Sequence, residues 1–226
     1  MFAEDGRRAP VKRVASAHPM PSPRVKRKTA YHHGDLRRAL INAALRLVNE
    51  SGASAVTLRE VARMVGVSHQ APYRHFADRA ALLAAVAEEG LRALHTELSQ
   101  AARNEPDVLS ALRACGVTYV LFAVAHPAHF RVMNSAEASA SDDPDLQAAS
   151  DAVFTLLTQT IAEARVGAEG EAATLEYALA AWSVVHGLAS LLVEGQLQRR
   201  PYAKKSPREL ANMALDTLRR GLLTRA

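Results

Sequence analysis

The chain has 226 residues, of which 49% are hydrophobic and 5% aromatic, and its formal net charge is +5. This length allows one sizeable core, or a small head joined to a larger body. Strand-like alternation with regular Gly/Pro turns is absent and alanine is abundant, which favours an all-α fold over a β-sheet. The single cysteine excludes an internal disulfide and favours a reducing compartment.

Neither export nor membrane insertion is expected. No positively charged start leads into an apolar signal core. The longest uncharged apolar run, 177–193, is flanked by Glu176 and Glu194. It is marginal for a membrane span of roughly 20 residues, so we expect a buried helix there and a cytoplasmic protein.

Positive charge gathers at the start of the chain. Residues 1–30 carry a net charge of +6, residues 31–79 carry +3, and residues 80–226 carry −4. The first segment is rich in proline and basic residues and poor in large apolar ones, so we expect it to be disordered. Two interpretations of it stay open: a basic arm on DNA, or a segment without a DNA role, which is a solubilising tail or results from a misplaced start codon.

Residues 31–79 are expected to form a DNA-binding head. Asp35 is a candidate cap for a first helix that ends at Gly52. Thr57 and Glu60 have capping-box spacing, and an apolar face of Leu58, Val61, Ala62 and Val65 follows. Gly66 is placed to end this second helix, and Ser68 to cap a third helix only about three residues later. So tight a turn predicts a helix-turn-helix motif over residues 57–76, which offers its second helix to the DNA major groove.

Residues 80–226 are expected to form a helical regulatory and dimerisation body. Asp78 is a candidate cap for a long helix to about Arg103, and Asp143-Pro144 marks a later helix start. Ser206 and Glu209 have the spacing of a second capping box, which predicts the start of the last helix. We expect nine helices in all, three of them in the head. The six helices of the body are expected over residues 78–103, 108–125, 128–134, 144–165, 171–198 and 206–222. Residues 135–143 are expected to form a loop.

The head resembles the TetR family of transcriptional regulators. The resemblance covers about residues 35–86 and rests on one string of motifs: Ser51-Gly52, Thr57, Gly66-Val67-Ser68, Tyr73-Arg74-His75-Phe76, Asp78-Arg79 and Leu82-Leu83. Trp182 with His186-Gly187 resembles the signature of the WHG-type C-terminal regulatory domain. The resemblance implies an all-α homodimer whose last two helices form a four-helix bundle with those of the partner. It also implies a cavity whose ligand releases the protein from DNA.

Residues of the motif can be given DNA-binding roles. Ser68, His69 and Gln70 stand at the start of the third helix, where a Gln side chain can bond adenine and a His can donate to guanine. Arg74, one turn later, can reach a guanine or a phosphate. By their positions in the family motif, four residues are expected to hold phosphates: Thr57, Tyr73, His75 and Arg79. We expect the Tyr73 ring to pack while its hydroxyl faces DNA, and Phe76 to belong to the core.

Pro72 departs from the commonest family pattern. It removes one amide from the first turns of the third helix, so we expect that helix to start late or to bend.

The body offers a tentative ligand pocket. Its candidate residues are Cys115, Phe122, His126, Met133, Trp182 and His186. Cys115 could be an oxidation sensor, but a buried thiol is the default on an apolar helix. A metal interpretation of His126 and His129 would need further ligands, so we expect no metal and no cofactor. Gly187 within a helix suggests a close helix approach, at a pocket floor or a dimer seam.

The expected function is a sequence-specific transcriptional regulator. The partners expected are a palindromic double-stranded DNA operator, an unknown small-molecule effector and a second copy of the chain. A repressor is favoured over an activator. The alternative is an architectural DNA-binding protein without an effector. An enzyme is not expected, because no catalytic set or phosphate loop has recognisable spacing.

Overall fold

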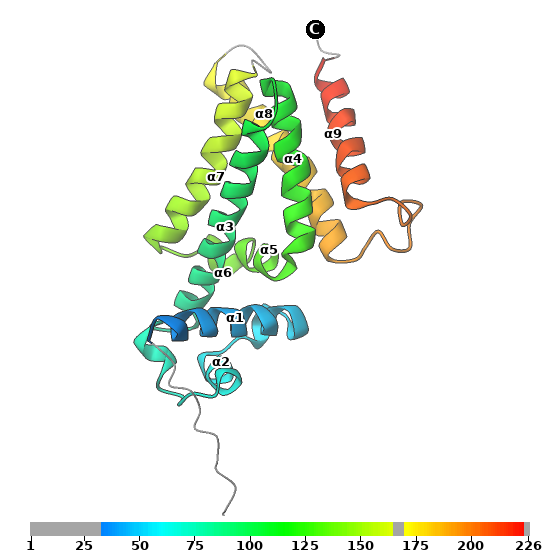
Figure 1. Cartoon of the computed structure of the whole chain (residues 1–226). Helices are drawn as coiled ribbons and strands as arrows, with labels where there is room; N and C mark the ends of the chain where they lie inside the picture. The colour runs from blue at the N-terminus through cyan, green and yellow to red at the C-terminus, as the bar shows by residue number, and fades with distance from the viewer. Residues whose placement is uncertain (1–32, 165–169, 224–226) are drawn as a thin grey trace, which may run out of the picture. The chain divides into compact units, whose positions relative to one another are not determined.

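The structure is a computed structural model that describes residues 33–164 and 170–223, and every regular element in these ranges is helical. The chain divides into units 1–31 and 32–226; the first, with the predicted basic tail, lies outside the described residues. Figure 1 shows the helices of the second unit. They are α1 (His33–Ser51), α2 (Leu58–Val65), α3 (Arg79–Arg103), α4 (Val108–Ala125), α5 (Pro127–Met133), α6 (Ala136–Ser139), α7 (Pro144–Glu163), α8 (Glu171–Val193) and α9 (Pro207–Leu223), with 3-10 helices at Ala53–Ala55 and Pro72–Arg74.

The caps of the head helices follow from local sequence. The Thr57 hydroxyl accepts a hydrogen bond from the Glu60 amide at 3.1 Å, which fixes the start of α2. Gly66 has a φ of 78°, and its amide donates to the carbonyls of Ala62 and Arg63 as α2 ends. The predicted end of α1 is also confirmed, because Gly52 follows Ser51 with a φ of 83°. Asp35, however, lies inside the first turn of α1, which begins at His33, so it is not the residue that precedes the helix.

The core of the head continues into the body. Leu40, Ile41 and Val61 are buried together with Leu82 of α3. The same cluster includes Val132 of α5. Since α3 contributes to this cluster and also packs against α4 and α7, it connects the head to the body within one packed unit.

The body is built around α3 and α4. α3 packs against α4 and α7, and α4 packs also against α8 and α9. Carboxylates cap three of these helices: Asp78 accepts from the Ala81 amide at 2.8 Å, Asp107 from Ser110 at 2.9 Å and Asp143 from Leu146 at 3.0 Å. The predicted starts of α3, α4 and α7 are therefore confirmed.

Four expectations for the helical elements are wrong. No α-helix forms at 69–76: Pro72–Arg74 is a single 3-10 turn. Residues 135–143 include the short helix α6. α8 stops at Val193 rather than Gln198, and Gly195 follows with a φ of 68°. The run 177–193 is not a buried helix, because its buried residues are Ala178, Val185 and Ala189 while Leu179 and Trp182 are exposed.

Close helix contacts occur at glycines other than the predicted one. A Cβ on Gly187 would meet nothing within 4 Å among the described residues, so no helix of the same chain approaches it closely, and the dimer-seam alternative stays a prediction. A Cβ on Gly90 would lie 2.6 Å from the Met133 sulfur and 3.1 Å from His129. Gly90 thus lets α3 and α5 meet, since any larger residue would force the two helices or their side chains to move.

Two helices of the described chain, α4 and α8, are long and apolar enough to cross a membrane by length and composition alone. α4 packs against α3, α8 and α9. α8 packs against α4, α7 and α9.

Candidate DNA interface and regulatory cavity

The predicted DNA contacts form an exposed stretch that follows α2. The side chains of Ser68, His69 and Gln70 are exposed, and so are those of Tyr73 and Arg74. Tyr73 is 55% exposed, so the predicted packing of its ring is not seen. Their shared exposure matches the requirement that base-reading side chains stand free of the protein core.

Pro72 explains the geometry of this stretch. The Ala71 amide donates to the Ser68 carbonyl at 3.0 Å, but Pro72 has no amide hydrogen to continue the pattern. The Pro72 ring is buried, and its carbonyl accepts from the amides of His75 and Phe76. A turn followed by one 3-10 turn therefore replaces the predicted third helix, and Ser68 caps no α-helix.

Phe76 anchors the stretch, as predicted. It is 3% exposed within the core of the head, and the Arg37 guanidinium lies 5.5 Å from its ring centroid. His75, the neighbouring residue, is half-buried. The exposed residues at 68–74 are thus held between the Gly66 turn and the buried Phe76 ring.

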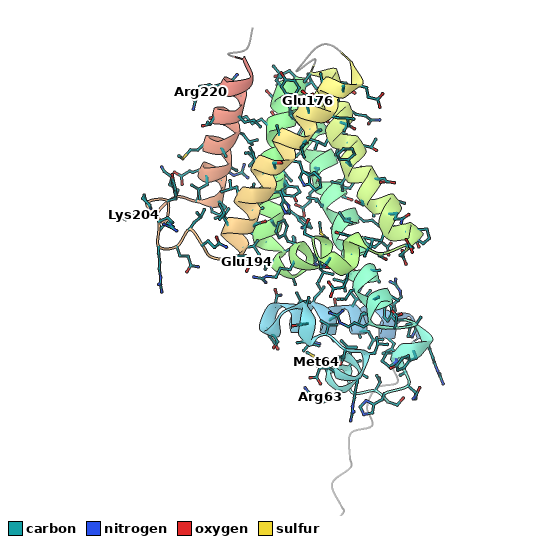
Figure 2. The ribbon with its side chains drawn as sticks, turned by 180° about the vertical axis from the view of Figure 1, so that it is seen from behind. Arg63, Met64, Glu176, Glu194, Lys204 and Arg220 are labelled. Atoms are coloured by element: carbon teal, nitrogen blue, oxygen red, sulfur yellow. The ribbon has the colours of Figure 1, made fainter. Side chains whose placement is uncertain are left out.

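The Thr57–Glu60 pair forms only half of a capping box. The Glu60 carboxylate binds the Arg63 guanidinium in place of the Thr57 amide, with Nε to Oε1 at 3.1 Å. Arg63 lowers the pKa of Glu60, and Glu60 raises the pKa of Arg63. Figure 2 shows Arg63 at the end of α2 in the head. The Thr57 hydroxyl keeps its own hydrogen and can still donate it to a phosphate.

Arg79 is bonded inside the protein. Its Nε donates to the Val56 carbonyl at 2.9 Å, and Nη2 donates to the Ala53 carbonyl at 3.0 Å. Nη1 pairs with the Glu137 carboxylate of α6 at 3.2 Å. These bonds connect the start of α3 to the 3-10 turn of the head and to α6, so Arg79 has a structural role beside the predicted phosphate contact.

A second connection between head and body passes through Glu89 of α3. Arg38 of α1 forms an ion pair with the Glu89 carboxylate, and His129 Nε2 of α5 lies 3.6 Å from its other oxygen. This Nε2 atom is buried, and no described residue lies within hydrogen-bonding distance of it. Burial lowers the pKa of His129, and the nearby Glu89 opposes that shift. His129 is therefore neutral at physiological pH. Within the described residues, no group of three or more His, Cys, Asp or Glu side chains could hold a metal ion.

A cavity of about 1310 Å³ lies in the body. α3, α4, α7, α8 and α9 contribute to its wall, together with residues that follow α5. This volume exceeds the usual range for small-molecule sites, roughly 300–1,000 Å³. Met133, which meets Gly90 of α3, is part of the wall, so the cavity adjoins the contact between α3 and α5.

Four of the six predicted pocket residues line this cavity: Cys115, Met133, Trp182 and His186. Phe122 and His126 do not. The Phe122 side chain is 2% exposed in the core, and the His126 ring lies tilted beside it with the ring centroids 4.7 Å apart. The Cys115 thiol donates to the Leu98 carbonyl at 3.6 Å, and burial raises its pKa to about 11. A protonated, buried thiol is a poor nucleophile, which agrees with the default interpretation.

Sequence reasoning missed the most connected polar group of the cavity, Tyr119. Its hydroxyl lies 3.0 Å from His186 Nδ1, and burial raises the pKa of Tyr119 to about 12, while a hydrogen bond from Trp182 acts in the opposite direction. Burial also lowers the pKa of His186. Tyr119 and His186 are 67 positions apart, so no spacing pattern could have paired them.

α8 exposes an apolar face to solvent. Leu175, Leu179 and Trp182 are 46%, 62% and 44% exposed, and Gly187, further along the helix, is exposed as well. Large exposed apolar side chains at helical spacing are typical of an interaction surface.

The fold and the exposed motif define a helix-turn-helix DNA-binding protein. Residues 40–86 match the family described as bacterial regulatory proteins, tetR family, and residues 112–218 match the tetracyclin repressor-like C-terminal domain. The chain therefore belongs to the TetR family of DNA-binding transcriptional regulators.

The chain is similar to several known proteins. It is 38% identical to the tetracycline repressor protein class C of Escherichia coli over 38% of this chain and 40% of that protein, less than half its length. It is 30% identical to the nucleoid occlusion factor SlmA of Marinomonas sp. (strain MWYL1) over 58% of this chain and 68% of that protein. A structure of a protein with unknown function from Rhodococcus sp. RHA1 has a TM-score of 0.70 and 33% identity, covering 86% of this chain and 98% of the other.

Proposed function

We propose that the chain is a cytoplasmic, homodimeric repressor that a small-molecule ligand releases from a palindromic operator. The observation that carries this proposal is the cavity of about 1310 Å³, which adjoins the packed contact between α3 and α5. α3 begins directly after the exposed DNA-binding stretch. A ligand that displaces Met133 or α6 therefore acts on elements that pack against the head.

Homodimerisation would bury the exposed apolar face of α8. Leu175 and Leu179 would meet the same residues of a second copy, because a two-fold interface uses one patch on both subunits. Gly187 would allow the two α8 helices to approach closely. A symmetric dimer places two heads on two half-sites, which explains why we expect a palindromic operator.

Within the head, we assign base reading to His69 and Gln70, with Arg74 available for a guanine or a phosphate. Thr57, Ser68, Tyr73, His75 and Arg79 are assigned to phosphate contacts and to holding the register. The 3-10 turn at Pro72 keeps His69 and Gln70 exposed ahead of Tyr73 and Arg74. Phosphate contacts fix position on the duplex, and base contacts specify sequence.

The reading role of Gln70 is tested by Gln70→Ala. The variant should lose roughly 1–3 kcal/mol on the preferred site, selected from random DNA, and relax base preference at one position of each half-site. Tyr73→Phe is the matched control, because it should weaken binding to all sequences about equally. Equal losses on specific and random DNA for Gln70→Ala would contradict the assignment.

An effector-independent architectural role is the second candidate, since the nucleoid occlusion factor SlmA matches over 68% of its own length. Footprinting separates the two. A short protected palindrome that disappears when a ligand binds supports the regulator. Uniform weak coverage with a steep salt response supports the architectural role.

A further inference from the structure

The cavity's chemistry narrows the kind of ligand that it can hold, an inference that rests on the proposed regulatory function. Its inner wall is apolar, with leucines of α3 and α7 such as Leu94, Leu98 and Leu156. Burying a ligand's apolar surface against such a wall is favourable by roughly 25 cal/mol per Å². A long or broad lipophilic body therefore fits the space.

Charged groups on the wall offer no net attraction to an ion. Four charged side chains line the cavity, two of each sign: Arg113, Arg219, Asp151 and Asp216. The Arg113 Nε lies 3.3 Å from Asp216 Oδ1, so these two groups neutralise each other. Arg219 and Asp151 are exposed to solvent, where water screens them. A ligand carrying a full charge would lose hydration on entry without a buried counter-charge to replace it.

The polar groups inside the cavity are uncharged. Tyr119 keeps its proton and His186 stays neutral, because burial shifts both pKa values away from the charged forms. The Tyr119 hydroxyl lies 3.0 Å from His186 Nδ1 and has no other acceptor among the described residues, so we assign its hydrogen to this nitrogen. An imidazole that accepts at Nδ1 carries its proton on Nε2, and this N–H is a donor without a partner among the described residues.

We propose that the cavity binds an uncharged, lipophilic molecule that carries one carbonyl or ether oxygen, and that His186 Nε2–H donates to this oxygen. Tyr119 acts as a positioning residue, since its hydroxyl holds the imidazole in the tautomer that donates. The aromatic rings of Phe130 and Trp182, with centroids 5.5 and 6.2 Å from the His186 ring, limit its rotation.

A matched series of ligands tests the charge preference. The full-length protein is titrated at pH 8 by calorimetry with 2-undecanone, undecanoate and undecylammonium, which share a chain length and differ in head group. Because Trp182 is the single tryptophan and lines the cavity, its fluorescence gives a second reading. The ketone should bind at least about tenfold more tightly than either ion.

Variants at His186 test the donor. His186→Phe should weaken ketone binding about five- to tenfold, the loss of one hydrogen bond, and His186→Gln should restore part of it by supplying another N–H donor. His126→Phe is the control, because His126 lies outside the cavity. Equal effects of His186→Phe and His126→Phe, tighter binding of either ion, or no ketone binding would each overturn the proposal.

Release from DNA is followed in the same titrations, by anisotropy of a labelled operator. Ketone binding without release would contradict the proposed ligand-released repressor and leave this ligand class intact. Release by undecanoate or undecylammonium alone would support ligand release and overturn the uncharged class.

Discussion

The head and helix α8 bury their apolar residues to very different extents. In the head, Leu40, Ile41 and Val61 are each at most 1% exposed and share one core with α3. α8 has a comparable supply of leucines, yet Leu179 is 62% exposed and Leu175 46%. The head buries its apolar residues within one chain, whereas α8 leaves apolar side chains exposed. This difference supports the proposal that a second copy of the chain covers α8.

The largest expected effect on stability comes from truncating a buried leucine of the head, compared with an exposed leucine of α8. Leu40→Ala should lower the free energy of unfolding by about 2–5 kcal/mol, because a fully buried side chain leaves a cavity behind. Leu179→Ala should change the unfolding of the isolated subunit by less than about 0.5 kcal/mol. Urea denaturation at low protein concentration measures both, and sedimentation should show a weakened dimer only for Leu179→Ala. Similar losses in stability would refute the contrast.

The junction between the regions is tested at Arg79. Arg79→Ala removes the side chain that donates to the partly buried carbonyls of Ala53 and Val56. It should lower the unfolding free energy by about 1–3 kcal/mol. Glu137→Gln removes only the exposed ion pair and should change stability little. The same denaturation assay compares them. If Glu137→Gln cost as much as Arg79→Ala, the bonds to the head would not be the main role of Arg79.

Glycine substitutions sharpen the comparison further. Gly90→Ala should destabilise by about 1–3 kcal/mol, because its Cβ would lie 2.6 Å from the Met133 sulfur. Gly187→Ala, with open space around it, should stabilise the isolated subunit by up to about 1 kcal/mol through helix propensity. Thermal unfolding at low protein concentration measures both changes, and the melting temperature should fall for Gly90→Ala and rise for Gly187→Ala. A loss of dimer in Gly187→Ala would place that glycine at the seam.

The smallest expected effect is a pH dependence at the α3–α5 contact. The folded pKa of His129 lies below its ordinary value of 6.5, because burial outweighs the attraction of Glu89, with Arg38 and His126 nearby. As pH falls, His129 therefore takes up a proton in the unfolded chain before it does so in the folded chain. The contribution of neutral His129 to the unfolding free energy is present above about pH 6.5 and decreases below it. His129→Gln should reduce the pH dependence of the unfolding free energy between about pH 5 and 7, compared with the natural chain. An unchanged slope would mean that His129 is not the responsible group.

The two capping-box patterns show how far local sequence can be trusted. Ser206 and Glu209 form the full reciprocal pair, with the Ser206 amide donating to Glu209 at 2.7 Å and the Glu209 amide to Ser206 at 3.2 Å. Thr57 and Glu60 have the same spacing but complete only one bond, because Arg63 takes the Glu60 carboxylate. Both helices start where the pattern predicts. The partner of the second side chain depends on what competes for it.

Much of the fold was determined by sequence alone. The helix starts at Thr57, Asp78 and Asp143 and the positive-φ end at Gly66 follow from hydrogen bonds within four residues, and such short-range bonds are readable from spacing. The motif also predicted the DNA-binding class and the burial of Phe76. Pro72 predicted a defect in the third helix, although not that a single 3-10 turn would replace it.

Tertiary structure alone decided the remaining features. The Tyr119–His186 contact, the internal bonds of Arg79 and the empty space around Gly187 depend on which helices become neighbours, and residues far apart in sequence carry no periodic signal of that pairing. Exposure of α8 has the same origin. Its composition is that of a core helix, but one chain supplies too few neighbours to cover all of its faces.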